Sequence, residues 1–600
     1  MHRNASKIRR RTGPAGHHRR GALTRFAVVL LAVVPLVVAL CAASQNVLAQ
    51  FPVGAGGQIQ QIPPAPVLER SPPVLPIPRQ AAPVAPAAPG PSFVVKSLRV
   101  TGETRFSEAE LVTVTGFKLG SVSTLSDLRA MAAKITNYYN ERGYFVAQAY
   151  LPPQDITDGT VTIAVIEGRY GQISLLNQTK VADVVFVRVL DGLKSGDLVN
   201  VAPLERRLLI ISDIPGVEVN STLAPGTAVG TSDLTVRVTP GPRFTGDVEA
   251  DNWGNPYTGA YLLGGTGNLN EPFGIGDVLS VRILGSTTGG MGYGRASYQA
   301  QVQDWTLGVA FTEFYYHLGK QFSALDAHGT EEIASVYASY PLIRSYNNNL
   351  NILFDFDERF FQDDIGATST DDDKRASVLI AGVSGDHTDT FGGGGWSTYS
   401  LIGSFGVLDI ETPAARAEDA ATARTNGEYA KLWASVSRVQ HLIGPLSLFG
   451  WIRGQAASKN LDISEKMELG GASGVRAFPE GEAYGDQGYI ATLEARLLLP
   501  PLPPRLPGRV QLIAFVDTGY VTVNHTPFVG STGYGTGNYY SPFGGSGPNG
   551  LTRSGAGGGI IWSAPNNFLV TVTYAYPIGS KATSYPDNSG QLWVQFVKFF

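Results

Sequence analysis

Residues 241–600 carry a hydrophobic pattern with a period of two. In the clearest runs, 279–283, 350–357, 489–497 and 568–574, apolar side chains alternate with polar or charged ones. Successive side chains of a β-strand point to opposite faces, so each run predicts a strand with one apolar and one polar face. Turn-forming residues separate such runs at intervals of about twenty residues.

Two kinds of β architecture produce this alternation. A soluble sandwich buries the apolar face of each sheet, whereas a membrane barrel turns it to lipid and encloses the polar face in a wet lumen. Here the polar positions carry charges between aromatic ones, as in Asp355 and Asp357 beside Phe354 and Phe356. This favours an all-β transmembrane barrel over 241–600, and the spacing of the runs gives about 16 antiparallel strands.

Residues 92–168 mix strand and helix periods. Strands are expected over 93–100, 144–151 and 160–166, with helices that open at Ser107 and at Thr124. Thr124 followed by Asp127 is typical of a capping box, which starts a helix. That helix has an apolar stripe at helical spacing, made by Leu128, Ala132, Ile135 and Tyr139.

Residues 169–240 repeat the same order of elements. The expected strands are 172–176, 217–223 and 234–238, and the expected helices are 181–190 and 203–211. A β-α-α-β-β order that occurs twice predicts two consecutive α+β domains before the barrel.

The N-terminal residues 1–49 have the pattern of a secretory signal peptide, with a basic segment and an apolar run before a cleavage site between Ala49 and Gln50. An uncleaved anchor is the alternative, but the apolar run is short for a membrane span. The only cysteine, Cys41, leaves with this segment, so the mature chain needs no disulfide. Residues 50–91 are rich in proline and show no helical period, which predicts a semi-stiff linker.

Composition and residue spacing argue against several classes of function. The net charge of −4 gives no indication of nucleic-acid binding. The histidines lie without the spacing of a metal site, and no serine lies in a nucleophile-elbow motif. We therefore expect no catalytic residue, no metal and no cofactor, and the chain is not expected to be an enzyme.

Two motifs in the last third of the chain carry the candidate site. One is Val475-Arg476-Ala477-Phe478 in a glycine-rich loop, and the other is Phe515, Asp517 and Gly519 on one face of an expected strand. Counted back from the C-terminus, the first motif lies in the sixth surface loop. An arginine on an inserted loop and an aspartate on the inner wall can form a strong pair in a low-dielectric lumen. A solvated loop with an unpaired arginine is the alternative.

These motifs resemble those of the two-partner secretion transporters, outer-membrane proteins that export large haemolysins and adhesins. The upstream units resemble their tandem polypeptide-transport-associated (POTRA) domains, through strings such as Gly143-Tyr144, Pro152-Pro153-Gln154 and Glu167-Gly168. Two unrelated α+β domains are the alternative. The resemblance implies POTRA domains over 92–168 and 169–240 in the periplasm. It also implies a pairing of Arg476 with Asp517, although the family usually has glycine where this chain has Ala477.

The resemblance also implies the partners of the chain. They are a secreted partner protein bound through its N-terminal secretion domain, the lipids of the outer membrane, and the barrel-assembly machinery. The last residue, Phe600, ends an alternating strand and resembles the signal that this machinery reads, unless the strand is a chance feature. An insertase of other barrels is an alternative function, although insertases usually carry more POTRA domains. A passive porin would not need such domains.

Overall fold

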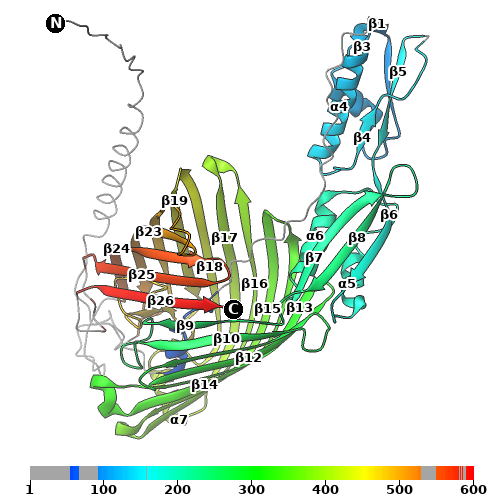
Figure 1. Ribbon diagram of the computed structural model, residues 1–600. Helices are drawn as coiled ribbons and strands as arrows, with labels where there is room; N and C mark the ends of the chain where they lie inside the picture. Colours follow the sequence, from blue (N-terminus) through cyan, green and yellow to red (C-terminus); the bar gives the residue numbers. More distant parts are fainter. Residues whose placement is uncertain are drawn as a thin grey trace, which may run out of the picture.

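The computed structural model describes residues 54–66, 92–156, 158–528, 549–579, 582, 584 and 589–600. The expected signal peptide and its cleavage site at Ala49 and Gln50 lie outside these residues. Within the described ranges, no helix has the length and apolar character needed to cross a membrane. Figure 1 shows a barrel with two α+β units that extend in a row from one side.

The barrel is one closed sheet of sixteen antiparallel strands, in which the last strand pairs with the first. This confirms the predicted barrel and its strand number. The strands are β9 (Phe244–Asp251), β10 (Leu262–Asn270), β11 (Asp277–Ser286), β12 (Met291–Val302), β13 (Trp305–His317), β14 (Ala327–Arg344), β15 (Asn348–Ile365), β16 (Thr370–Asp389), β17 (Gly395–Ile410), β18 (Gly427–Ile443), β19 (Leu446–Ala457), β22 (Gln487–Leu498), β23 (Arg509–Thr522), β24 (Gly550–Ala564), β25 (Phe568–Pro577) and β26 (Gln591–Phe599).

The barrel wall follows the period-two pattern of the sequence. On β15, Phe354 and Phe356 expose 43% and 45% of their surface, whereas Asp357 exposes only 6%. The aromatic side chains face outward, where lipid is the solvent, and the carboxylate faces the lumen. On β23, Phe515 and Asp517 are buried and Leu512 on the opposite face is exposed, as the alternation predicted.

The seam between β26 and β9 closes the sheet. It contains five residue pairs, from Gln595 opposite Asp251 to Phe599 opposite Asp247. Beyond them, Phe600 and Gly246 exchange two backbone hydrogen bonds of 3.0 Å. A Cβ on Gly246 would lie 2.1 Å from the Thr266 carbonyl oxygen and 2.9 Å from the Phe600 ring, so glycine allows the close approach of both.

The first α+β unit lies farther from the barrel (Figure 1). It contains β1 (Ser92–Val95), β2 (Ser97–Thr101), α3 (Glu108–Thr115), β3 (Ser121–Thr124), α4 (Leu125–Glu141), β4 (Gln148–Tyr150) and β5 (Thr160–Ile166). Thr124 and Asp127 form the predicted capping box, and the predicted stripe of α4 is its buried face.

Two expectations for this unit were wrong in detail, and one strand was not expected. The strand expected over 93–100 is divided at Lys96, whose N–H donates to the Gly159 carbonyl at 2.8 Å and so leaves the β1–β3 ladder. The strand expected over 144–151 is reduced to β4, because Ala147 N–H closes a turn on the Tyr144 carbonyl at 3.0 Å. The short β3, which pairs with β1, was not expected.

The second unit follows the predicted order. It contains β6 (Arg169–Asn177), α5 (Asp183–Leu190), α6 (Val201–Ser212), β7 (Val217–Pro225) and β8 (Thr231–Pro240), with the sheet order β6-β8-β7. Its helices cover one face of the sheet and share with it a single apolar core that includes Phe186, Leu208 and Val236.

Arg169 joins the two units beside a buried carboxylate, that of Glu167. Glu167 accepts hydrogen bonds from the Thr104 N–H at 2.7 Å and from the Tyr139 hydroxyl at 2.8 Å. Burial raises the pKa of the Glu167 carboxyl, but its hydrogen bonds together outweigh burial and lower it. Arg169 donates to Thr104 Oγ1 at 2.7 Å and to the Gly196 carbonyl of the second unit at 2.9 Å. The two units therefore form a continuous arm.

Ion pairs fix the second unit to the barrel. Asp304, between β12 and β13, binds Arg206 of α6 at 3.0 Å and Arg207 at 2.8 Å. Arg344 at the end of β14 makes two hydrogen bonds of 2.7 Å to Asp213, the residue that ends α6. These contacts place the arm at the end of the barrel that carries the turns between β12 and β13 and between β14 and β15.

Residues 54–66 lie inside the barrel, so the extended linker expected over 50–91 was wrong for this part. They contain the short helix α2 (Ala55–Ile59), which contacts β13, β14 and β15. The Ala55 N–H donates to Asp363 at 2.7 Å, and Arg282 donates to the Pro63 carbonyl at 2.9 Å. A five-residue helix has no repeat from which its period could be read, and its partners lie hundreds of residues away.

A second unexpected helix, α7 (Pro413–Ala421), lies in the loop between β17 and β18. No helical period was expected anywhere in the barrel region. All described α7 side chains are at least partly exposed, so the helix lacks the buried stripe that a sequence pattern reveals. Short 3₁₀ turns complete the elements: η1 (Lys320–Leu325), η2 (Gly366–Thr368), η3 (Phe391–Gly393) and η4 (Ile463–Glu465).

Deletion of Phe600 should lower the amount of folded barrel in the membrane. The deletion removes the last backbone pair of the seam, and unpaired backbone groups are costly in lipid. We expect less heat-modifiable protein on gels of outer-membrane fractions and more degradation in the periplasm. Phe600→Ala keeps the backbone pair and isolates the effect of the ring. Unchanged barrel levels after the deletion would show that Phe600 is an ordinary strand residue.

Candidate functional site

The candidate site is a loop that turns back into the barrel. Residues 458–486, here called loop 6, connect β19 to β22, the eleventh and twelfth strands of the barrel. Within the loop, β20 (Met467–Glu468) pairs with β21 (Tyr484–Gly485) and forms the stem of a hairpin. At the tip, Phe478 N–H donates to the Val475 carbonyl at 3.0 Å and fixes a tight turn around Arg476.

The tip packs into the inner wall through apolar contacts. Val475, Ala477 and Phe478 are buried in a cluster with Ile513 and Phe515 of β23. Ala477 does not adopt a positive φ. Alanine therefore replaces the glycine that is usual in the family without backbone strain. The room comes instead from the wall: a Cβ on Gly555 of β24 would lie 2.2 Å from the Ala477 Cβ.

Arg476 binds the wall with its whole guanidinium group. Nε and Nη2 donate to the two carboxylate oxygens of Asp517 at 2.9 Å each, and Nη1 donates to Glu494 at 2.8 Å. The Arg476 side chain is 13% exposed and that of Asp517 is fully buried. A bidentate pair of this kind fixes the orientation of both groups as well as their distance.

Neighbouring groups complete the pair. Thr492 donates to Asp517 at 2.9 Å, and the backbone N–H of Arg476 donates to the same carboxylate at 3.2 Å. The guanidinium carbon lies 3.3 Å from the centre of the Phe515 ring, which adds a cation–π contact. Arg496 neutralises the second carboxylate, Glu494, at 2.8 Å. Two arginines thus balance two buried acids.

The structure therefore brings together Arg476, Phe515 and Asp517 from the two predicted motifs. Gly519 serves the loop in another way, since a Cβ there would lie 2.5 Å from Leu469 Cδ1 of loop 6. Thr492 and Glu494 were not among the residues expected at the site. Their signal was present, because both lie on the polar face of the strand expected over 489–497.

A second buried pair holds the returning limb of loop 6. Arg553 of β24 donates to Glu482 at 2.7 Å, and both side chains are almost completely buried. The Arg553 guanidinium carbon lies 5.4 Å from the centre of the Phe478 ring, beside the tip. Neither residue belonged to a motif, and no pattern in the sequence connects them.

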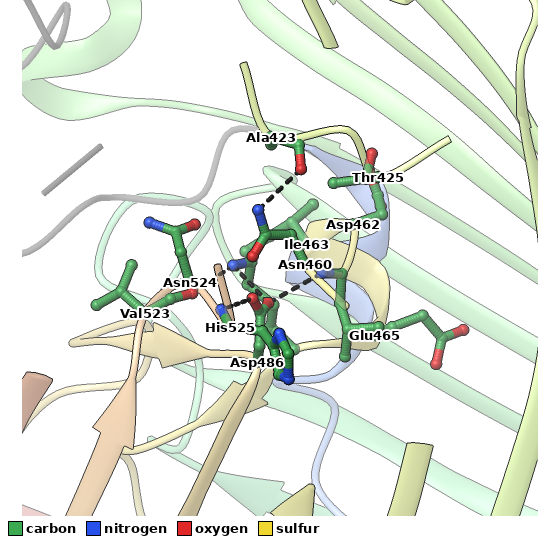
Figure 2. Close-up of polar contacts among 12 residues, drawn as sticks. Ala423, Thr425, Asn460, Asp462, Ile463, Glu465, Asp486, Val523, Asn524 and His525 are labelled. Atoms are coloured by element: carbon green, nitrogen blue, oxygen red, sulfur yellow. Dashed lines mark hydrogen bonds and ion pairs between the residues drawn. The ribbon is translucent and has the colours of Figure 1, made fainter. Parts of the chain in front are cut away.

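The base of loop 6 is tied to the two adjacent surface loops (Figure 2). Asn460 donates to the Ala423 carbonyl at 2.8 Å and to the Thr526 carbonyl at 2.9 Å. Asp486 accepts hydrogen bonds from the backbone N–H of His525 at 2.6 Å and pairs with Lys466 at 2.7 Å. Both ends of loop 6 are therefore anchored where the loop enters the barrel.

The limb of loop 6 that enters the barrel also binds the barrel wall and residues 54–66, here called the N-terminal segment. Glu465 of η4 pairs with Arg359 at 2.9 Å and with Lys431 at 2.6 Å. Gln60 of the N-terminal segment donates to the Ile463 carbonyl at 2.8 Å, and Gln61 donates to the Tyr484 hydroxyl at 2.5 Å. Residues 54–66 thus contact both limbs of loop 6, and the two segments occupy the lumen together.

The described residues contain no group of three or more histidine, cysteine, aspartate or glutamate side chains arranged to hold a metal ion. The chemistry of the site is that of paired charges that position a loop.

Gly555→Val should displace the tip of loop 6 although Arg476 and Asp517 themselves are not substituted. The new side chain would occupy the space of the Ala477 methyl group, and over-packing of a buried contact costs about 1–3 kcal/mol. We expect trypsin to cleave after Arg476 on intact cells faster than in the wild type. Gly450→Val is the matched control, since Gly450 on β19 has open space around it. Equal protection of Arg476 in both variants would contradict the close contact at Ala477.

Comparison with known proteins agrees with this geometry. Residues 93–168 match the family model of the POTRA domain, ShlB-type. Residues 230–538, more than half of the chain, match the model of the haemolysin secretion/activation protein ShlB/FhaC/HecB.

Individual relatives extend the similarity over most of the chain. The heme/hemopexin transporter protein HuxB of Haemophilus influenzae strain 86-028NP is 27% identical over 488 residues, which cover 80% of this chain and 82% of HuxB. The outer membrane transporter CdiB of Dickeya dadantii strain 3937 is 26% identical over 450 residues, 73% of this chain and 78% of CdiB.

Two solved structures share the fold. CdiB from Escherichia coli has a TM-score of 0.66 at 20% identity, and the match covers 87% of this chain and 93% of the CdiB chain. CdiB from Acinetobacter baumannii has a TM-score of 0.57 at 18% identity, and the match covers 90% of this chain and 96% of the CdiB chain. The relatives are transporters, which does not support the alternative of an insertase. The chain belongs to the haemolysin secretion/activation family and is an outer-membrane transporter of two-partner secretion, with periplasmic POTRA domains and a barrel that exports a partner protein.

Proposed function

We propose that loop 6 and residues 54–66 close the lumen at rest and must move when the partner protein passes through the barrel. The observation that carries this proposal is the bidentate pair of Arg476 and Asp517, which holds an inserted loop against the wall. Both lumen segments are held by many polar contacts. A polar contact can be replaced by water when a segment leaves, so such a closure can open without loss of the barrel.

We further propose that the two POTRA units, 92–168 and 169–240, bind the N-terminal secretion domain of the partner. The second sheet has the order β6-β8-β7, and among the described residues β7 pairs only with β8. Part of β6 is covered, since Tyr170 exchanges backbone hydrogen bonds with Asp197 and Gly196. The outer edge of β7 is therefore the edge that best accepts an added strand from the partner.

The same proposal includes removal of the signal peptide, assembly of the barrel and the driving force of export. Removal of residues 1–49 between Ala49 and Gln50 would leave the lumen segment 54–66 close to the mature N-terminus. The barrel-assembly machinery would recognise the strand that ends at Phe600, and outer-membrane lipids would surround the apolar wall. No nucleotide is available in the periplasm, so folding of the partner outside the cell would drive its export in the outward direction.

Arg476→Ala and Asp517→Ala should each impair export while the barrel still assembles. Removal of one partner of a buried pair leaves an uncompensated charge, which costs about 3–5 kcal/mol. Export is measured as the amount of partner protein released from the cells, and assembly as heat-modifiable barrel. Arg438→Ala is the control, because Arg438 forms a comparable bidentate pair with Asp389 at 2.7 and 2.9 Å, away from loop 6. Wild-type export by both site variants would refute this role.

A fragment that contains residues 92–240 should fold alone and bind the partner's secretion domain, because each unit has its own apolar core. The neighbouring variants Asn220→Pro and Ser221→Pro test the edge of β7. Alternate N–H groups of an edge strand point outward, so only one of the two substitutions spares the β7–β8 ladder. Circular dichroism identifies the variant that stays folded, and we expect that variant to lose binding in calorimetry. Undiminished binding by it would rule out the β7 edge.

A further inference from the structure

Trp593 of the closing strand contacts the tip of loop 6. Its side chain is 4% exposed, and its indole Nε1–H donates to the carbonyl of Arg476 at 2.7 Å. This carbonyl belongs to the residue whose side chain binds Asp517 and Glu494. Arg476 is therefore held at two places on the barrel wall, by its guanidinium on β22 and β23 and by its carbonyl on β26.

The two attachments have different consequences for the loop. The guanidinium is at the end of a long side chain, so the pair with Asp517 alone would allow the backbone of the tip to shift. The carbonyl is part of the backbone, and a hydrogen bond to it fixes the peptide plane between Arg476 and Ala477. A backbone position fixed in this way determines where both neighbouring side chains point.

At Trp593, strand β26 forms a ladder with β25 but not with β9. The ladder between β26 and β9 begins at Gln595 opposite Asp251, so residues 591–594 have no strand partner on that side. The side chain of Asn252 takes the place of a strand: it accepts a hydrogen bond from the Val594 N–H and donates to the Leu592 carbonyl, both at 2.7 Å. Asn252 also donates its backbone N–H to the Val594 carbonyl at 3.1 Å, so a single residue, chiefly through its side chain, holds this end of the seam.

We propose that Trp593 is a positioning residue for export: it registers the tip of loop 6 on the closing strand, so that Arg476 reaches Asp517 only in a closed barrel. The set of contacts around Arg476 is incomplete until β26 is in place. Docking of loop 6 is consequently coupled to closure of the seam, and displacement of the loop during export removes one of the side-chain contacts that hold the end of β26.

The test removes only the indole N–H. Replacement of Trp593 by 3-benzothienylalanine keeps the size and shape of the ring system and substitutes sulfur for the donor, and Trp593→Phe is the simpler variant. Loss of the partner of a buried carbonyl should raise the rate of trypsin cleavage after Arg476 on intact cells by about tenfold. Mass spectrometry of the fragments identifies the cleaved bond, and heat-modifiable barrel is measured in parallel.

Trp562→Phe is the matched control. Trp562 of β24 also donates an indole N–H to a backbone carbonyl, but that carbonyl belongs to Pro507, in the turn between β22 and β23 and not in loop 6, at 2.9 Å. We expect this variant to keep the wild-type rate of cleavage. If the benzothienyl variant also keeps Arg476 protected, the hydrogen bond does not position the loop and the proposal is wrong.

A double variant separates positioning from general weakening of the barrel. If Trp593 acts through Arg476, Trp593→Phe should add little to the cleavage rate of Asp517→Asn, in which the loop is already released. Full additivity of the two effects would overturn the proposal. The effect of Trp593 on export rests on the proposed closure of the lumen by loop 6. The cleavage assay, in contrast, measures only the position of loop 6. Altered cleavage with normal export would therefore reject the proposed closure and the link to export, and would leave only the positioning of loop 6 by Trp593.

Discussion

The requirement that every backbone polar group in lipid has a partner governs the whole structure. In a membrane sheet this requirement is met only when the last strand pairs with the first, so β26 must reach β9. A closed sheet of sixteen strands is too wide for its own side chains to fill, and it leaves an interior that must be occupied or open. The inserted loop and the N-terminal segment follow from that width.

The contents of the lumen are mainly paired charges and hydrogen-bonded polar groups. Arg476 with Asp517, Arg553 with Glu482, and Glu465 with Arg359 and Lys431 each bring opposite charges together in buried positions. Buried ion pairs add little net stability compared with apolar packing, but they allow few alternative arrangements. They suit a closure that must have one position and must also be able to leave it.

The periplasmic arm is built for fixed placement. Arg169 joins the two α+β units, and the ion pairs of Asp304 and Asp213 join the second unit to the barrel. A partner bound on this arm would be presented to one end of the lumen at a constant position. The charged groups that attach the arm to the barrel are partly exposed, so high salt would weaken this attachment more than the fold of either unit.

Local patterns in the sequence determined most of the architecture. The capping box at Thr124, the buried stripe of α4, the two faces of β15 and β23 and the inward position of Asp517 could all be read from residues a few positions apart. Periodicity reports which side of an element is buried, and burial is a local consequence of strand and helix geometry. The motifs around Arg476 and Asp517 could be read in the same way, with the help of a family resemblance.

Only the tertiary structure decided how distant segments meet. The helix α2 inside the lumen, the division of the expected strand at Lys96, the pair of Arg553 with Glu482 and the contact of Trp593 with Arg476 had no local signal. Each depends on the path of a loop or on the register between strands far apart in the chain. Periodicity carries no information on either, because it describes one element at a time, whereas these contacts exist only after the barrel has closed around the loop.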